Sequence, residues 1–412
     1  MTHGESPRRI VAWLRTPQAV RERCHAVLRL AEQDRLAHFA LDFARMDDVA
    51  DYVAAVTRAN YPDLAVPYHS RWRHFETGGV DRWGAMAPLL SACDAAEQAR
   101  VRIDLCTVSV LLDAGAGPDW SFHEALTGQT LRRSEGLAVA SLDAFRAGLF
   151  SGDPDRPLRV DANGLSRISE VVLADAFQVS AANKLVGLAG RAALLRNLGA
   201  ALRRQPDLFG SGARLGNMFD VWQSYSAHGG LSAGQVLTTV LEAFASIWPG
   251  RLTLDRENLG DVWPHPMLHG EGPAAGLVPF HKLSQWLCYS LVEALEQSSI
   301  AVTGLDALTG LAEYRNGGLF IDLGVLRLRD PALATVPLAP DHPAIVEWRA
   351  LTVALLDRLA PMLRARLGCS KAQLPLARVL QGGTWDAGRQ IARERRADGS
   401  PPLAVISDGS IF

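Results

Sequence analysis

Apolar residues recur along this chain at the three-to-four-residue spacing of amphipathic helices. The first clear case follows Asp47 and Asp48 and stops before Pro62, which gives a helix with an acidic start and a proline stop. The pattern predicts helices over stripes that run from Val49 to Val56, Val101 to Leu112, Leu142 to Leu149, Leu188 to Leu198, Val236 to Ile247, Leu283 to Leu295 and Leu305 to Ala312. We therefore expect a mainly α fold.

Cap and turn residues refine this picture. Ser232 and Gln235 have the spacing of a capping box, so Ser232 is expected to start a helix. Gly317-Gly318 is expected to end the last helix of the series in a left-handed cap. Only two short strand segments are predicted, from Ile321 to Leu328 and from Leu403 to Phe412, the second with an Asp408-Gly409 turn.

Two loop-like stretches divide the chain. The segments from Gly152 to Pro157 and from Gln205 to Gly216 are rich in proline and glycine. We expect an N-terminal helical region over residues 1–150 and a helical catalytic region over residues 151–412, with one integrated body as the alternative.

Composition limits the function classes. Of 412 residues, 48% are hydrophobic, and 42 basic side chains nearly balance 44 acidic ones. The apolar content excludes intrinsic disorder, and no apolar run is long enough to span a membrane. The N-terminus lacks an apolar signal segment, so a cytoplasmic protein is expected. The net charge of −2 favours a small-molecule ligand over nucleic acid, whereas the oligomeric state stays open.

Cysteine and metal signals are weak. The five cysteines show no C-x-x-C pair, so neither a disulfide framework nor a zinc site is expected. His265 and His269 have i, i+4 spacing, but Pro266 lies between them and no H-E-x-x-H glutamate is present. Residues 230–234 match G-x-S-x-G without the strand that a nucleophile elbow requires. No metal or cofactor is therefore expected.

Two polar segments are candidate binding elements. Residues 66–76 combine arginine and histidine with aromatic side chains, and Tyr68, His69 and Arg71 in this segment suit a phosphate or a planar group. An exposed interface loop is the alternative. Asp113, with Trp120 close after it, adjoins a glycine-rich turn and either contacts a ligand or makes an Asx turn.

A third candidate lies on the helix around residue 287. Lys282, Gln285 and Tyr289 share one face of a helix that is otherwise apolar, which favours burial of Lys282. A buried lysine requires an anionic partner. Glu313 is one candidate for that partner, and a surface position for Glu313 is the alternative.

Four long strings of residues resemble the uracil catabolism protein 4 family. They are VPYHSRWRHF (66–75), SVLLDAGAGPDW (109–120), RSEGL (133–137) and LQGGTW (380–385). The resemblance runs from about residue 60 to the C-terminus. It implies a step in a route that converts uracil to urea through a ribosylated, ring-opened intermediate, and it does not by itself supply a mechanism.

Shorter blocks are similar to those of the queuosine salvage nucleosidases, which hydrolyse an N-glycosidic bond on a helical scaffold like that of DNA glycosylases. These blocks include HKLSQ (281–285), LTGLAEYR (308–315) and EWRA (347–350). The similarity implies that Lys282 and Glu313 occupy the pocket, although the nucleosidases carry aspartate where this chain has Glu313. It adds Tyr314, Arg315 and Arg349 to the binding candidates.

Together the two resemblances imply a hydrolase that cleaves the ribose–urea bond of ribosylurea or its 5′-phosphate. Glu313 would stabilise or attack the sugar, and Lys282 would hold phosphate or position the carboxylate. Asp113, Gln285, Tyr68, His69 and Arg71 would bind substrate, and Trp120 would line the pocket. An amidohydrolase acting on the ureido group and a non-catalytic partner of pathway enzymes are the alternatives.

Overall fold

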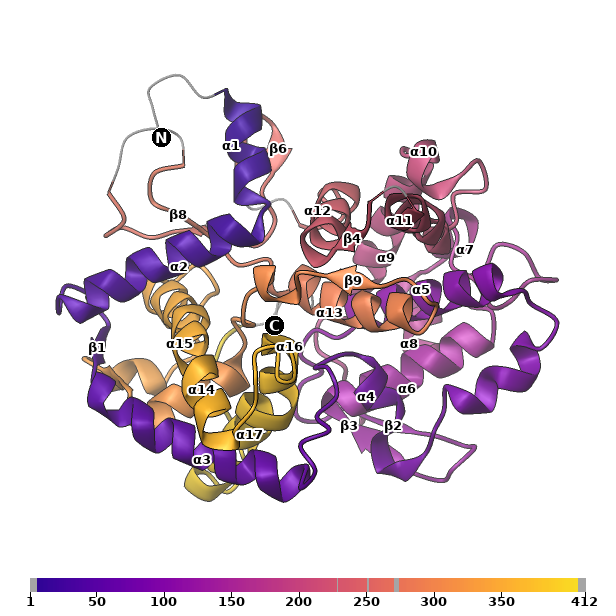
Figure 1. Cartoon of the computed structure of the whole chain (residues 1–412). Coiled ribbons are helices and arrows are strands. Elements are labelled where there is room, and N and C mark those ends of the chain that lie inside the picture. The colour runs from indigo at the N-terminus through magenta and orange to yellow at the C-terminus, as the bar shows by residue number, and fades with distance from the viewer. Residues whose placement is uncertain (1–5, 228, 250–251, 270–273, 407–412) are drawn as a thin grey trace. The chain divides into compact units, whose positions relative to one another are not determined.

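The computed structural model describes residues 6–227, 229–249, 252–269 and 274–406. Helices dominate it, and the strands are short (Figure 1). The helices are α1 (Pro7–Leu14), α2 (Pro17–Glu32), α3 (Met46–Asn60), α4 (Trp72–Phe75), α5 (Ala95–Leu111), α6 (Arg133–Arg146), α7 (Ala162–Ser166), α8 (Glu170–Ala176), α9 (Leu188–Arg203), α10 (Pro206–Phe209), α11 (Met218–Ala227), α12 (Ala233–Ala243), α13 (Lys282–Glu296), α14 (Tyr314–Asp322), α15 (Pro343–Leu367), α16 (Leu376–Val379) and α17 (Asp386–Arg395). The predicted mainly α class is confirmed.

The strands pair two by two within the described ranges. They are β1 (Phe39–Leu41) with β10 (Leu326–Leu328), β2 (Ser121–His123) with β3 (Thr130–Arg132), β4 (Leu231–Ser232) with β9 (Val302–Thr303), β5 (Thr253–Leu254) with β6 (Glu257–Asn258), and β7 (Val262–Pro264) with β8 (Leu277–Pro279). The β4–β9 pair is parallel and the others are antiparallel. These strands join loops and do not form a continuous sheet.

The chain forms two compact units, and each is built from separate stretches of sequence. Unit 1 contains the described residues of Met1–His69, Arg251–Gln285 and Gly304–Ile406. Unit 2 contains those of Ser70–Gly250 and Trp286–Thr303. The division into residues 1–150 and 151–412 stays a prediction.

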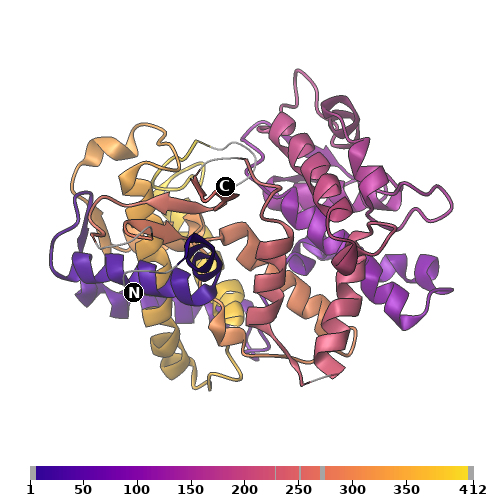
Figure 2. The same ribbon diagram turned by 90° about the horizontal axis from the view of Figure 1, so that it is seen from above.

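Helix α15 is the central element of unit 1. Pro343 at its first turn and Gly368 in the left-handed conformation after its last residue define its ends. It packs against α2 and α3, so the first and the last parts of the chain lie side by side (Figures 1 and 2). Helices α14 and α17 form a second close pair in this unit.

Helix α5 is the central element of unit 2. Asp94 caps it by accepting a hydrogen bond from the backbone N–H of Glu97. Residues 103–112 are buried without exception, and α5 packs against α6, α9 and α11. Because this stretch is covered on all sides, even its polar residues Asp104, Thr107 and Ser109 are buried.

One predicted helix is wrong. The segment that starts at Leu305 forms only a short 3-10 turn, Leu305–Ala307, and then becomes extended at Leu308. The following helix, α14, begins at Tyr314 and contains Gly317 and Gly318 instead of ending there. A β-carbon on Gly317 would lie 2.6 Å from side-chain atoms of α15, so this glycine permits close helix packing.

The predicted strand from Ile321 to Leu328 is only partly right, because Ile321 and Asp322 still belong to α14 and β10 contains only Leu326–Leu328. In the predicted C-terminal strand, Val405 makes an isolated bridge to Leu338, whereas the Asp408-Gly409 turn lies outside the described residues. No helix among the described residues has the length and apolarity that crossing a membrane requires.

Candidate functional site

Glu313 stands at the N-terminus of α14, where the sequence had suggested the end of a helix. Its carboxylate accepts hydrogen bonds from the backbone N–H groups of Arg315 at 2.8 Å and Asn316 at 2.5 Å. The positive end of the helix dipole therefore faces this acid. Glu313 is only 8% exposed, so its carboxyl group is buried at the start of this helix.

Two opposing effects act on the Glu313 carboxyl group. Burial raises its pKa above the ordinary glutamate value, and this effect prevails. The two backbone hydrogen bonds and the positive charges of Lys282 and Arg315 favour the ionised form. Glu313 is thus a buried carboxyl group that lies within electrostatic reach of the Lys282 ammonium group.

Lys282 begins α13, and Asp261 fixes that end of the helix. The Asp261 carboxylate accepts a hydrogen bond from the Lys282 backbone N–H at 3.0 Å and two from the guanidinium of Arg349, at 2.7 and 2.8 Å. Burial opposes ionisation of Asp261, but the Arg349 ion pair prevails and places its pKa well below the ordinary range. The predicted burial of Lys282 holds in part, because the side chain is half-buried.

Gln285 connects α13 to the segment that leads to Glu313. Its amide nitrogen donates to the hydroxyl oxygen of Thr309, and its amide oxygen accepts from the Thr309 backbone N–H at 3.0 Å. Both residues are buried. Gln285 therefore holds the segment before Glu313 in place. Its predicted contact with substrate stays a prediction.

His69 lies against a π-helix formed by Leu380–Trp385. The His69 backbone N–H donates to the carbonyl of Ala377 at 2.9 Å, and its Nδ1 lies 2.9 Å from Oε1 of Gln381. Burial lowers the pKa of His69 to about 4, and the nearby Lys282 charge acts in the same direction, so the ring is neutral at physiological pH.

The π-helix also reaches the acid. Thr384 donates a hydrogen bond of 2.8 Å to Oδ1 of Asn316, whose backbone N–H donates to the Glu313 carboxylate. π-Helical segments concentrate at functional sites. Sequence reasoning singled out the LQGGTW string only as a family resemblance, and it missed Asp261, Asn316, Gln381 and Thr384.

Tyr314 and Arg315 follow the acid directly. The Arg315 guanidinium lies 4.8 Å from the centre of the Tyr314 ring and donates to the carbonyl of Gly399 at 2.9 Å. Tyr68 makes a similar contact, with the Arg378 guanidinium 5.3 Å from its ring centre. Unit 1 thus contains eight of the predicted site residues: Tyr68, His69, Lys282, Gln285, Glu313, Tyr314, Arg315 and Arg349.

Arg71 and Asp113, two predicted binding residues in unit 2, bind each other. The Arg71 guanidinium donates to the Asp113 carboxylate at 2.7 Å and to the hydroxyl of Ser109 at 2.7 Å. Arg71 is fully buried. Trp120 is also fully buried, and its indole N–H donates to the carbonyl of Phe177 at 2.9 Å. Their predicted contacts with substrate stay predictions.

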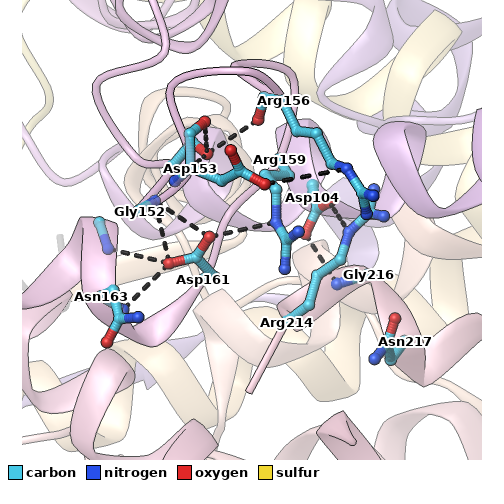
Figure 3. Close-up of polar contacts among 12 residues, drawn as sticks. Asp104, Gly152, Asp153, Arg156, Arg159, Asp161, Asn163, Arg214, Gly216 and Asn217 are labelled. Atoms are coloured by element: carbon cyan, nitrogen blue, oxygen red, sulfur yellow. Dashed lines mark hydrogen bonds and ion pairs between the residues drawn. The ribbon is translucent and has the colours of Figure 1, made fainter. Parts of the chain in front are cut away.

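A second ionic cluster in unit 2 ties loops to α5 (Figure 3). The Asp104 carboxylate accepts from Arg214 at 2.9 Å and from the backbone N–H of Gly216 at 2.7 Å. Asp161 accepts from the backbone N–H groups of Gly152, Asn163 and Gly164. Each of these two carboxylates pairs with an arginine, Asp104 with Arg214 and Asp161 with Arg159, and with backbone N–H groups of the loops. This arrangement indicates that the cluster stabilises the fold.

The weaker motifs are structural where the structure describes them. Ser232 caps α12 with a complete capping box, as predicted. His265 is buried beside Glu347 at 3.4 Å, whereas His269 is exposed. No group of three or more metal-ligating side chains occurs within the described ranges.

Comparison with known proteins finds one family model and two relatives that each match nearly the whole chain. A family model described as "Protein of unknown function (DUF1688)" matches residues 13–412. "Protein urg3" of Schizosaccharomyces pombe is 37% identical over 409 residues, which cover 98% of this chain and 99% of that protein. "Uracil catabolism protein 4" of Lachancea kluyveri is 37% identical over 439 residues, with the same coverage. The chain therefore belongs to the DUF1688 family, together with uracil catabolism protein 4.

Proposed function

We propose that this protein is an N-glycosidase of uracil catabolism that hydrolyses ribosylurea 5′-phosphate to urea and ribose 5-phosphate. The name of the Lachancea kluyveri relative supports the pathway, because uracil catabolism is the process for which that protein is named. The choice of reaction rests on the chemistry of the residues around Glu313.

The observation that carries the proposal is a buried carboxyl group at a helix N-terminus, within electrostatic reach of the Lys282 ammonium group. Cleavage of the bond between C1′ and the urea nitrogen builds positive charge on the ribose. An ionised Glu313 near C1′ stabilises that charge, and its position at the N-terminus of α14 fixes its direction. Water supplies the oxygen that bonds to C1′, and the departing nitrogen gains a proton.

Lys282 has a complementary role in this proposal. Its charge favours the ionised form of Glu313 and so opposes the effect of burial, which raises the pKa of this carboxyl group. Asp261 and Arg349 fix the start of α13 and thereby the position from which Lys282 extends. The lysine then holds the substrate's phosphate or the carbonyl oxygen of the ureido group.

The test is an assay of the purified protein with synthetic ribosylurea and its 5′-phosphate, in which urea and ammonia are measured separately. We expect urea without ammonia, and a loss of about 10³-fold in kcat in Glu313→Gln. Ammonia as the product would favour an amidohydrolase instead. Full activity of a folded Glu313→Gln would refute the assignment.

Glu124→Gln is the matched control. Glu124 is also a buried glutamate, but it pairs with Arg82 in unit 2 through two hydrogen bonds of 2.7 Å. Its substitution should lower the free energy of unfolding and leave kcat unchanged. This control separates a loss of catalysis from a loss of stability.

A further inference from the structure

His281, the residue directly before α13, has an unusual backbone conformation. Its φ is +48°, in the left-handed region that residues other than glycine adopt rarely. The His281 carbonyl accepts a hydrogen bond from the Gln285 N–H at 2.9 Å, so His281 is the N-cap of α13, where an extended backbone is usual. Strained residues of this kind concentrate at functional sites and require contacts that hold them.

A hydrogen bond from the imidazole ring holds His281 in this conformation. Nε2 lies 2.8 Å from the carbonyl oxygen of Leu14, the last residue of α1. Because a carbonyl oxygen only accepts hydrogen bonds, Nε2 carries the ring proton and donates it. Burial lowers the pKa of His281, and the charges of Arg15 and Arg349 act in the same direction, whereas Asp261 opposes them. The ring is therefore a neutral donor at physiological pH.

Helix α1 is a firm anchor for this bond, because its apolar face packs against the segment that precedes α13. The buried residues of this cluster are Ile10, Val11, Leu14, Leu259, Val262 and Ala274. Asp261 lies in the same segment, and its backbone oxygen accepts from the Phe280 N–H at 2.9 Å while its carboxylate accepts from the Lys282 N–H at 3.0 Å. The start of α13 is thus held from two sides, by Asp261 and by α1.

We propose that His281 is a positioning residue for Lys282: its ring, anchored on α1, keeps the backbone left-handed before α13 and so fixes where the lysine ammonium lies relative to Glu313. The inference rests on the proposed function and names a residue that sets the geometry of its two central groups. Asp261 fixes the Lys282 backbone N–H, whereas the torsion at His281 sets the direction in which the chain continues from there. His281 acts through Lys282 and not on the substrate.

Substitutions at position 281 separate the hydrogen bond from the backbone strain. His281→Gly removes the bond but also relieves the strain, because glycine adopts positive φ readily, so stability should change little. His281→Gln keeps a side-chain N–H donor, and Gln178 shows that glutamine adopts a φ of +55° in this chain. We expect His281→Gly to loosen the placement of Lys282 and His281→Gln to retain it.

The lysine itself reports its placement. The chain has three lysines, Lys184, Lys282 and Lys371, so a protein labelled with ¹³C at the lysine Cε gives a simple NMR spectrum. Protonation of Glu313 at acidic pH should shift the Lys282 resonance, and this step should be absent in Glu313→Gln. In His281→Gly its midpoint should rise by about half a pH unit or more, because a more distant ammonium favours the ionised acid less. Lys371 is the internal reference.

The same variants are assayed with ribosylurea 5′-phosphate across pH. The proposed mechanism requires an ionised Glu313, so the acidic limb of kcat/KM should move to higher pH together with the lysine step. In His281→Gly we expect kcat/KM at neutral pH to fall about 10-fold, and His281→Gln should stay within about 3-fold of wild type. Arg315, the other positive charge that favours ionised Glu313, is unchanged in these variants.

Gln178→Gly is the matched control. Gln178 in unit 2 also has a left-handed backbone, and its side-chain amide makes two hydrogen bonds of 2.9 Å with the backbone of His123. The control should change neither the Lys282 resonance nor kcat/KM. A purely structural effect of removing such a residue would appear in both variants.

The outcomes distinguish two failures. If the wild-type protein releases no urea, the proposed function is wrong, and the lysine resonances still decide whether His281 positions Lys282. If it releases urea but His281→Gly leaves the acidic step of Lys282 unchanged, only the inference is wrong. His281→Asn keeps the test decisive if His281→Gly does not fold, because asparagine tolerates the left-handed region but has a shorter side chain.

Discussion

The guanidinium of Arg349 and the carboxylate of Asp261 share two hydrogen bonds, at 2.7 and 2.8 Å, across 88 residues of sequence. Arg349 is 2% exposed, and its guanidinium lies 4.1 Å from the centre of the Phe280 ring. This pair joins α15 to the loop that caps α13. It therefore connects the stability of unit 1 to the placement of Lys282.

Arg349→Met should lower the free energy of unfolding by about 3–5 kcal/mol, because it leaves the Asp261 carboxylate buried without its main partner. Chemical denaturation measures this change. Arg45→Ala is the control, since the Arg45–Asp48 pair is more than half exposed on both sides, so its loss should leave the free energy of unfolding almost unchanged. Equal effects of the two variants would contradict a buried role for Arg349.

Thr384→Val should reduce both stability and activity. The substitution keeps the shape of the side chain but removes the hydroxyl that donates to Asn316, and leaving a buried acceptor unpaired costs about 1–3 kcal/mol. Because the Asn316 backbone N–H donates to the Glu313 carboxylate, kcat should also fall. Thr352→Val is the control: the buried Thr352 hydroxyl donates to the Trp348 carbonyl within α15, so its loss should leave kcat unchanged.

Gly388→Ala should destabilise the protein by about 1–3 kcal/mol or more, because a β-carbon there would lie 2.1 Å from the carbonyl oxygen of Arg315. Gly234→Ala on α12 is the opposite case. The atom nearest to a β-carbon at this position would be the Ser232 hydroxyl oxygen, 3.9 Å away. Alanine should therefore stabilise the helix by about 0.5–1 kcal/mol. Thermal unfolding of the two variants should therefore shift in opposite directions.

Asp104 should make unit 2 less stable as pH rises. Burial raises its pKa to about 6 from 3.8, even though Arg214 pairs with it. Between these two pH values the folded state binds more protons than the unfolded state, so stability falls with increasing pH. The loss from this group approaches about 3 kcal/mol above pH 6.

Comparison of wild-type protein with Asp104→Asn isolates this effect. The stability of the wild type relative to the variant should be highest near pH 4 and should decrease towards pH 7. Denaturant unfolding across this range measures the difference. A difference that does not change with pH would mean that the Asp104 pKa is not raised.

Local signals in the sequence identified most helices. The spacing of Ser232 and Gln235 predicted the cap of α12, and the stripe from Leu188 to Leu198 predicted α9, because caps and amphipathic faces depend on neighbours three or four residues away. The prediction of a helix over Leu305 to Ala312 was wrong because tertiary contacts override the helical spacing of its apolar residues. Gln285, more than 20 residues earlier, holds the Thr309 segment out of a helix.

The sequence predicted which residues belong to the candidate site, but not how these residues contact one another. Family resemblance drew attention to Lys282 and Glu313. No local pattern shows that Asp261 fixes the start of α13, or that Thr384 binds Asn316, the residue that donates to the Glu313 carboxylate. These contacts join residues far apart in sequence. A single sequence carries no periodic signal for such long-range pairs.

The make-up of unit 1 has a consequence for synthesis of the protein on the ribosome. Helices α2 and α3 are translated early, yet the helix that packs against both of them, α15, ends at Leu367. Their apolar faces therefore lack their main native partner until most of the chain has been made, and partly folded chains that expose apolar surface are prone to aggregation. Expression in cells should accordingly depend on chaperones and on the rate of translation through the last hundred or so codons, more than on the stability of the finished fold.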